Sequence, residues 1–134
     1  MAQAKPHVAS VHLVGKEGYV QEIRARTHAL RSDEFGMPGG TDAGPTPVEL
    51  LLAAVGACTA TTLRMYAERK GWELGEIKID LRLVEEDGGS RIERRLRFGA
   101  ELGEDARRRL LEIAGRTPVT RMVAEGTPIE TQLG

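Results

Sequence analysis

The chain has 134 residues, of which 40% are hydrophobic and 29% charged, and its formal net charge is -1. A length of this order is typical of one domain, so residues 1–134 are predicted to form a single domain with a buried core. The balanced charge gives no electrostatic reason to expect a nucleic-acid partner or an anionic membrane. Cys58 is the only cysteine, which excludes an internal disulfide and fits a reducing cytoplasm.

The first predicted elements are two strands, residues 8–14 and 19–30, joined by a turn at the sequence GKEG. A long two-stranded arm is marginal by itself, so it needs another surface to pack on. A Gly/Pro-rich loop follows at residues 31–46, and loops of this length are usually functional or mobile.

This loop leads into a helix with a clear start signal. Thr46 is a suitable N-cap, a proline follows it, and Glu49 completes a Thr-x-x-Glu capping box. The helix is predicted to run to about Lys70, with Gly71 as its stop. Up to Leu63 it is otherwise apolar or small on every side, which predicts burial all round. The apolar run is shorter than the roughly 20 residues that a bilayer requires, so no membrane span is expected.

The second half of the chain alternates more regularly. Residues 77–84 and 90–98 predict a second hairpin, residues 103–115 an amphipathic helix, and residues 129–133 a last strand after a short helix or turn. The order ββ-α-ββ-α-β predicts an α+β fold in which antiparallel sheets wrap around a central helix. The second hairpin also carries a row of arginines that is predicted to be a solvated strand face: Arg91, Arg94, Arg95 and Arg97.

Cys58 and Glu49 are the candidate site residues. Most free cysteines are small buried hydrophobes, and the capping box alone would explain Glu49. Nine positions at about 100° each place the two on opposite sides of a straight helix, roughly 13 Å apart along its axis. A shared site therefore requires a break, predicted near Val55–Gly56. Such a break would put Cys58 at the start of a new helix, where backbone N–H groups favour a thiolate.

The cation expected beside that thiolate is one of Arg24, Arg26 and Arg31, although each of them also fits an ordinary solvated position. No metal and no cofactor are expected.

The segment GGTDAGPTPVELLLAAVGACTATTLRMYAERKGW, residues 39–72, closely resembles the signature of the OsmC/Ohr family of thiol peroxidases, in particular its OsmC-like subgroup. The later segment LLEIAGRTPVTR resembles the second motif of the family, so the resemblance covers essentially the whole chain. It implies an intertwined homodimer in which β-hairpins wrap two central helices, and it implies reduction of organic and fatty-acid hydroperoxides. It also implies that Cys58 is the peroxidatic cysteine and Glu49 the acid that fixes a catalytic arginine.

The second motif departs from the family pattern, which usually reads Arg-Cys-Pro-Val-His-Arg. Residues 116–121 read RTPVTR, so Thr117 stands at the position of the resolving cysteine and Thr120 at that of the histidine. Without a second thiol, a Cys58 sulfenic acid cannot close an intramolecular disulfide, and an external thiol must act as reductant. The alternative function is a family member without turnover that binds a small apolar ligand, or senses oxidant, at the dimer pocket.

Overall fold

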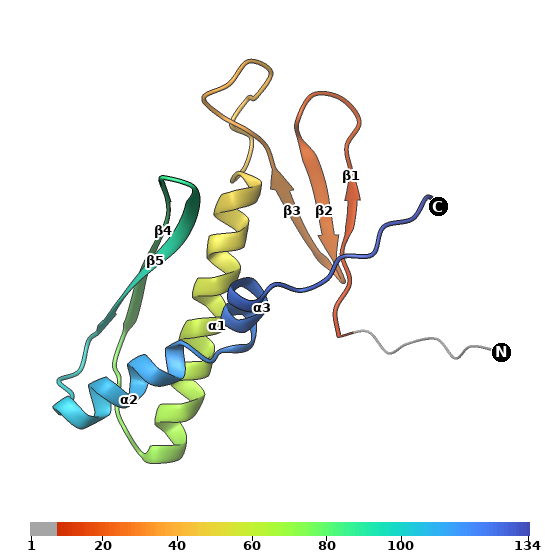
Figure 1. Cartoon of the computed structure of the whole chain (residues 1–134). Helices are drawn as coiled ribbons and strands as arrows, with labels where there is room; N and C mark the ends of the chain where they lie inside the picture. The colour runs from red at the N-terminus through yellow and green to blue at the C-terminus, as the bar shows by residue number, and fades with distance from the viewer. Residues whose placement is uncertain (1–7) are drawn as a thin grey trace. The chain divides into compact units, whose positions relative to one another are not determined.

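A computed structural model describes residues 8–134. The chain divides into two compact units, Met1–Leu50 and Leu51–Gly134, with the boundary inside the long helix. Figure 1 shows the elements, and they confirm the predicted α+β class with antiparallel sheets. Their order is β1 (His12–Val14), β2 (Gln21–Ala25), β3 (His28–Ser32), α1 (Pro47–Lys70), β4 (Ile77–Glu86), β5 (Gly89–Phe98), α2 (Glu104–Ala114) and α3 (Pro118–Glu125).

The first unit holds a three-stranded antiparallel sheet in the order β1-β2-β3. The predicted first hairpin is present, but the single strand predicted over residues 19–30 is wrong. The chain reverses at Arg26 and Thr27, so that Ala25 pairs with His28. Arg26 takes the left-handed conformation, with φ 55°, that such a tight turn requires. The turn contains no Gly, Asn or Asp, which are the residues that usually indicate a tight turn in a sequence.

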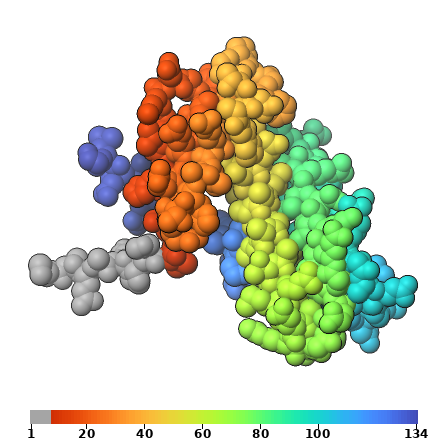
Figure 2. Space-filling view, turned by 180° about the vertical axis from the view of Figure 1, so that it is seen from behind, coloured from red at the N-terminus to blue at the C-terminus, as the bar shows by residue number. Residues whose placement is uncertain are grey.

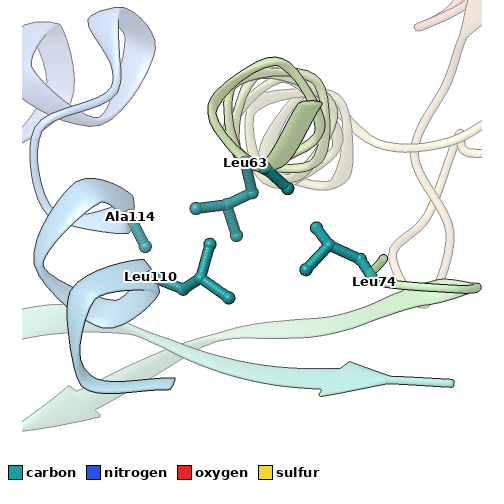
Figure 3. Close-up of a cluster of buried hydrophobic side chains, with 5 residues drawn as sticks. Leu63, Leu74, Leu110 and Ala114 are labelled. Carbon is teal, nitrogen blue, oxygen red and sulfur yellow. The ribbon is translucent and has the colours of Figure 1, made fainter. Parts of the chain in front are cut away.

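The second unit contains the hairpin of β4 and β5, whose pairing runs from Ile77 opposite Phe98 to Glu86 opposite Gly89. This hairpin and α2 confirm the predictions for residues 77–98 and 103–115. Side chains from α1, α2 and the segment after α1 form the buried core of the unit (Figure 3). The core residues are Leu63, Ala67, Leu74, Leu110 and Ala114.

The helix α1 is buried along one stripe only, and not on all sides as the sequence predicts. The stripe follows the spacing of four residues that brings side chains to one helix face: Val55, Thr59, Leu63 and Ala67. Only 17% of the apolar window of α1 is buried within the chain. Figure 2 shows the yellow and yellow-green atoms of α1 open at the surface along the helix. Within the second unit, a large apolar face of α1 is thus left without a cover.

By length and composition α1 could also cross a membrane, because the full helix is longer than the apolar run considered in the sequence. The central helix of a soluble protein passes the same test, so the composition of α1 does not by itself indicate a membrane span.

The end of the chain differs from the prediction. The short helix is confirmed as α3, but the last strand predicted at residues 129–133 is wrong, because residues 127–134 have no regular structure. Ile129 and Leu133 are both almost fully exposed. A strand forms only where its backbone groups pair with a neighbouring strand, and residues 129–133 pair with none within the described chain.

Candidate functional site

The Gly/Pro-rich loop before α1 is organised around one carboxylate. Asp33 is buried, and its two oxygens accept hydrogen bonds from the backbone of Glu34, Thr41 and Ala43 and from the Thr41 hydroxyl, at 2.6 to 3.1 Å. The Thr41 hydroxyl and these backbone N–H groups lower the pKa of Asp33 to about 2. The loop, which the sequence predicts to be functional or mobile, is therefore held in one conformation by hydrogen bonds to the Asp33 carboxylate.

The capping box predicted at the start of α1 is confirmed. The backbone N–H of Thr46 donates to Glu49 Oε1 at 2.8 Å, and the backbone N–H of Glu49 donates to Thr46 Oγ1 at 3.2 Å. Glu49 is exposed, and its second carboxylate oxygen remains available for another donor.

The break predicted near Val55–Gly56 is wrong, because α1 is one continuous helix from Pro47 to Lys70. Cys58 is half-buried in the interior of this helix, where backbone N–H groups bond to carbonyls one turn earlier and are not free to stabilise a thiolate. The unbroken helix keeps Glu49 and Cys58 on opposite sides, roughly 13 Å apart along the axis. One copy of α1 therefore does not bring the acid and the thiol together.

Gly56 and Thr59 lie near the predicted break and have roles in packing. Gly56 allows a close approach of β4, because a Cβ at this position would lie 2.8 Å from Leu81 Cδ1. Thr59 is fully buried, and its hydroxyl donates to the Val55 carbonyl at 2.7 Å and accepts from Arg94 Nη1 at 2.9 Å. Both residues disfavour a helix by intrinsic propensity, and both are explained by what α1 packs against.

Arg94 is the residue that the sequence reasoning missed. It was predicted to lie on a solvated strand face, but it is half-buried and points toward α1 from β5. Besides Thr59, it donates from Nη1 to Thr120 Oγ1 and from Nη2 to the Ala114 carbonyl, both at 2.8 Å. Position 94 has the same parity as Ile92 and Leu96, which is the signal that could have placed it on the inner face.

The second motif lies in this same cluster. Thr117 is fully buried, and its hydroxyl donates to Thr120 Oγ1 at 2.7 Å. Arg94 then connects Thr120 to Thr59, the residue after Cys58. Thr117 is thus linked to the helix turn that carries the thiol through three hydroxyls, those of Thr117, Thr120 and Thr59, and the Arg94 guanidinium.

The three candidate arginines lie in the first unit and are exposed. Arg24 is on β2 opposite Ala29, Arg26 is in the turn, and Arg31 is on β3 opposite Glu22. Their individual positions do not select one of them as the partner of Cys58. Within residues 8–134, no three His, Cys, Asp or Glu side chains gather where they could hold a metal ion.

The fold matches solved structures over most of their length. An OsmC-like protein from Mycoplasma pneumoniae is 17% identical with a TM-score of 0.77, and 91% of each chain is covered. The organic hydroperoxide resistance protein OhrB of Bacillus subtilis is 22% identical with a TM-score of 0.60, covering 90% of this chain and 93% of its own. An organic hydroperoxide resistance protein OsmC from Legionella pneumophila is 16% identical with a TM-score of 0.64, covering 90% and 91%. These similarities define the class as the OsmC/Ohr fold.

The sequence model of the OsmC family, described as OsmC-like protein, matches residues 40–132. The chain belongs to this family. Comparison with curated proteins gives no match.

Proposed function

We propose that the chain is a one-cysteine hydroperoxide reductase that acts on alkyl or fatty-acid hydroperoxides and takes its electrons from an external thiol. The observation that carries the proposal is Cys58, the only cysteine of the chain, which lies half-buried on α1 inside the segment that matches the OsmC-like family. Two of the similar structures are named organic hydroperoxide resistance proteins, which supports the choice of substrate. A lone thiol suits the reducing cytoplasm, where we place this reaction.

The reaction balances with one peroxide and two thiols. The Cys58 thiolate attacks the distal peroxide oxygen, so the S–O bond forms as the O–O bond breaks, and the alkoxide leaves as an alcohol after taking a proton. The resulting sulfenic acid reacts with a first external thiol to give a mixed disulfide and water. A second thiol then releases the Cys58 thiolate and leaves as the oxidised disulfide.

The proposed site is completed by a second copy of the chain. Because continuous α1 separates Glu49 from Cys58, the acid that acts on a given thiol comes from the other copy. The same copy supplies the cation, one of Arg24, Arg26 and Arg31, held by the free carboxylate oxygen of its Glu49. The uncovered apolar face of α1 supports this assembly as a homodimer.

A second candidate function is favoured by the missing resolving cysteine. Thr117 cannot form a disulfide with an oxidised Cys58, so a protein whose sulfenic acid no external thiol reduces would stop after one oxidation. In that case it binds a small apolar ligand, or senses oxidant, at the dimer pocket without turnover.

Steady-state consumption of cumene hydroperoxide with 2-mercaptoethanol as reductant separates the two functions. For the reductase, we expect the wild-type protein to consume many equivalents of peroxide and Cys58→Ser to consume none. Consumption of a single equivalent would reject the reductase in favour of the sensor. Consumption by Cys58→Ser at the wild-type rate would reject both, because the chemistry would not depend on the thiol.

A further inference from the structure

The second unit contains an open-sided cavity of about 780 Å³ lined by residues of α1, the β4–β5 hairpin, α2 and α3. Its volume lies within the roughly 300 to 1,000 Å³ that is usual for small-molecule sites. Most of its wall is apolar, including Leu51, Val55, Leu83, Ile92 and Leu111. Cys58 does not line it, so the cavity is not explained by the proposed thiol chemistry.

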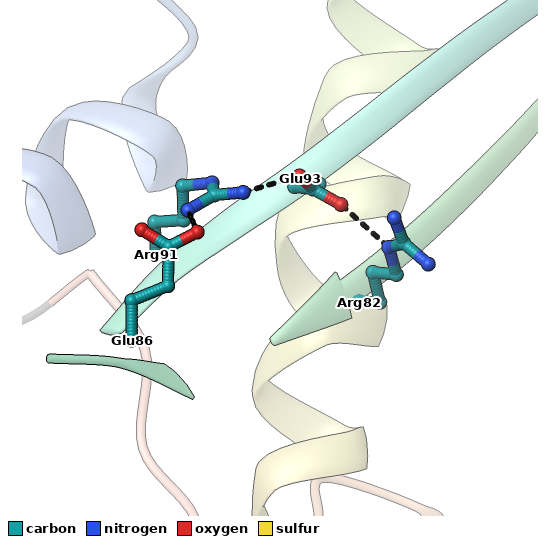
Figure 4. A network of polar contacts seen from close by, with 4 residues as sticks. All are labelled: Arg82, Glu86, Arg91 and Glu93. Carbon is teal, nitrogen blue, oxygen red and sulfur yellow. Dashed lines mark hydrogen bonds and ion pairs between the residues drawn. The ribbon is translucent and has the colours of Figure 1, made fainter. Parts of the chain in front are cut away.

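The charges on the wall of this cavity have one sign. Arg91 and Arg94 are among its lining residues, and no carboxylate is. Arg91 is already neutralised on the hairpin surface, where it forms ion pairs with Glu86 and Glu93 (Figure 4). Arg94 therefore supplies the charge that the cavity presents to a ligand.

Arg94 has no acidic partner among the described residues, since none of their ion pairs includes it. Its three hydrogen bonds end on two threonine hydroxyls and one backbone carbonyl, all neutral. A guanidinium has five donors, so donors remain beyond these three. Burial lowers the pKa of Arg94, which shows that the side chain is partly removed from water and that no anion offsets the cost. A buried cation of this kind gains from an anionic partner.

We propose that the cavity binds a small amphipathic anion, with a single carboxylate on Arg94 and an apolar chain along the wall formed by α1, β5 and α2. The hydroxyls of Thr59 and Thr120 hold the guanidinium in place, so the donor geometry exists before the ligand arrives. The apolar wall excludes ligands that are charged along their length. The inference goes beyond the proposed peroxide reduction, since neither the carboxylate site nor the wall uses Cys58.

The experiment is isothermal titration calorimetry of the full chain with decanoate, with decan-1-ol and decylammonium as probes of the same chain length. Decanoate should bind at least about tenfold more tightly than decan-1-ol, because a hydrogen bond between two charged groups is stronger than one to a neutral hydroxyl. Decylammonium should bind more weakly than either. Cys58→Ser protein should give the same affinities, which separates this result from any failure of the peroxidase assay.

Two variants and one matched control locate the site. Arg94→Gln should weaken decanoate binding by about tenfold or more while leaving decan-1-ol unchanged. Arg95→Gln removes the same charge from the next residue of β5, which is exposed and does not line this cavity, and should leave both affinities unchanged. Ala124→Trp fills the cavity from α3, keeps the Arg94 side chain, and should abolish binding of both probes, whatever the stability of Arg94→Gln.

The proposal is overturned if decanoate and decan-1-ol bind equally, or if Arg95→Gln weakens decanoate as much as Arg94→Gln does. It is also overturned if decanoate does not bind at all, which is the result expected if side chains of a second copy fill the cavity.

Discussion

Asp33 and Arg94 are two charged side chains held away from bulk water, and each is satisfied in a different way. The Asp33 carboxylate accepts four hydrogen bonds from its own loop, three of them from backbone N–H groups. Arg94 instead joins α1, α2 and α3 to β5 through neutral oxygens. Asp33 therefore fixes a local loop, whereas Arg94 fixes the packing of several elements and keeps an unmatched charge.

The hydrogen bonds of Asp33 predict an acid-dependent contribution to stability. The pKa of Asp33 in the folded chain is about 2, below the ordinary value of 3.8. The stabilisation is therefore fully present above the unfolded pKa, at about pH 4, and is lost as the pH falls through about 2. Asp33→Asn should lower the free energy of unfolding at pH 6, and its difference from wild type should shrink as the pH approaches 2. Urea unfolding at a series of pH values measures this difference.

Asp42→Asn is the matched control for this series. Asp42 lies in the same loop, is exposed, and has φ 53°, a conformation that asparagine tolerates. Its substitution should change stability by no more than about 0.5 kcal/mol. A difference between wild type and Asp33→Asn that stays constant down to pH 2 would contradict the role assigned to Asp33.

Thr117 gives a prediction about the missing disulfide. Its burial beside the hydroxyls that lead to Thr59 supports a position close to Cys58, and a disulfide requires Cα atoms within about 7 Å. Thr117→Cys should form an intramolecular disulfide after peroxide treatment and resist sulfinic acid formation, whereas wild type should overoxidise without a small thiol. The lost hydrogen bond to Thr120 should cost about 1 kcal/mol.

Intact mass and free-thiol counts after peroxide treatment measure this outcome, with Cys58→Ser/Thr117→Cys as the control that cannot close the bridge. If Cys58 oxidises in Thr117→Cys while no bridge forms, the second motif lies too far from the thiol for the family mechanism to apply.

At the scale of elements, the continuity of α1 depends on what packs against it. Gly56 is flexible in isolation, but in the folded chain the lack of a side chain lets Leu81 of β4 approach. Thr59 is a poor helix former, yet its hydroxyl is bonded on both sides. Contacts with β4 and β5 therefore offset the low helix propensity of Gly56 and Thr59.

Gly56→Val tests this close approach. The added methyl groups would meet Leu81 Cδ1, since the Cβ alone would lie 2.8 Å from that atom, and the cost should be about 1 to 3 kcal/mol. Leu81→Ala removes the clash, so the double variant should lose less stability than the sum of the two single variants. Gly89→Val is the control, because no atom lies within 4 Å of a Cβ at Gly89. Additive losses in chemical denaturation would show that Gly56 and Leu81 do not compete for space.

The elements that the sequence predicts well are those whose signal is local. The capping box at Thr46 and the strict alternation of β4 specify their structure without reference to the rest of the chain. The turn at Arg26, the inward position of Arg94 and the lack of a strand at residues 129–133 depend instead on pairing and packing partners. For the candidate site, the sequence singled out Cys58 and Glu49 and showed that a straight helix would separate them, but the break predicted to bring them together is absent from α1.

At the scale of the whole molecule, a single chain leaves surfaces that are costly in water. The face of α1 opposite the buried stripe carries Ala54, Ala57, Thr61 and Met65, all exposed. The sheet of β4 and β5 has two strands, so each strand also has an unpaired edge within the described chain. Exposed apolar faces and open strand edges are typical of surfaces that another chain covers. The low net charge of -1 does not oppose association of identical copies.

We therefore expect an obligate homodimer in which the open face of α1 is buried, and a charge on that face should prevent its formation. Sedimentation at low micromolar concentration should give twice the chain mass of 14.6 kDa for the wild type. Ala57→Glu should give a monomer or an unfolded chain, because an unpaired carboxylate in an apolar interface costs several kcal/mol. Ala9→Glu makes the same change at an exposed position before β1 and should remain dimeric. A folded wild-type monomer, or a dimer that survives Ala57→Glu, would show that α1 is not the interface, and a site completed by Glu49 from a second copy would lose its basis.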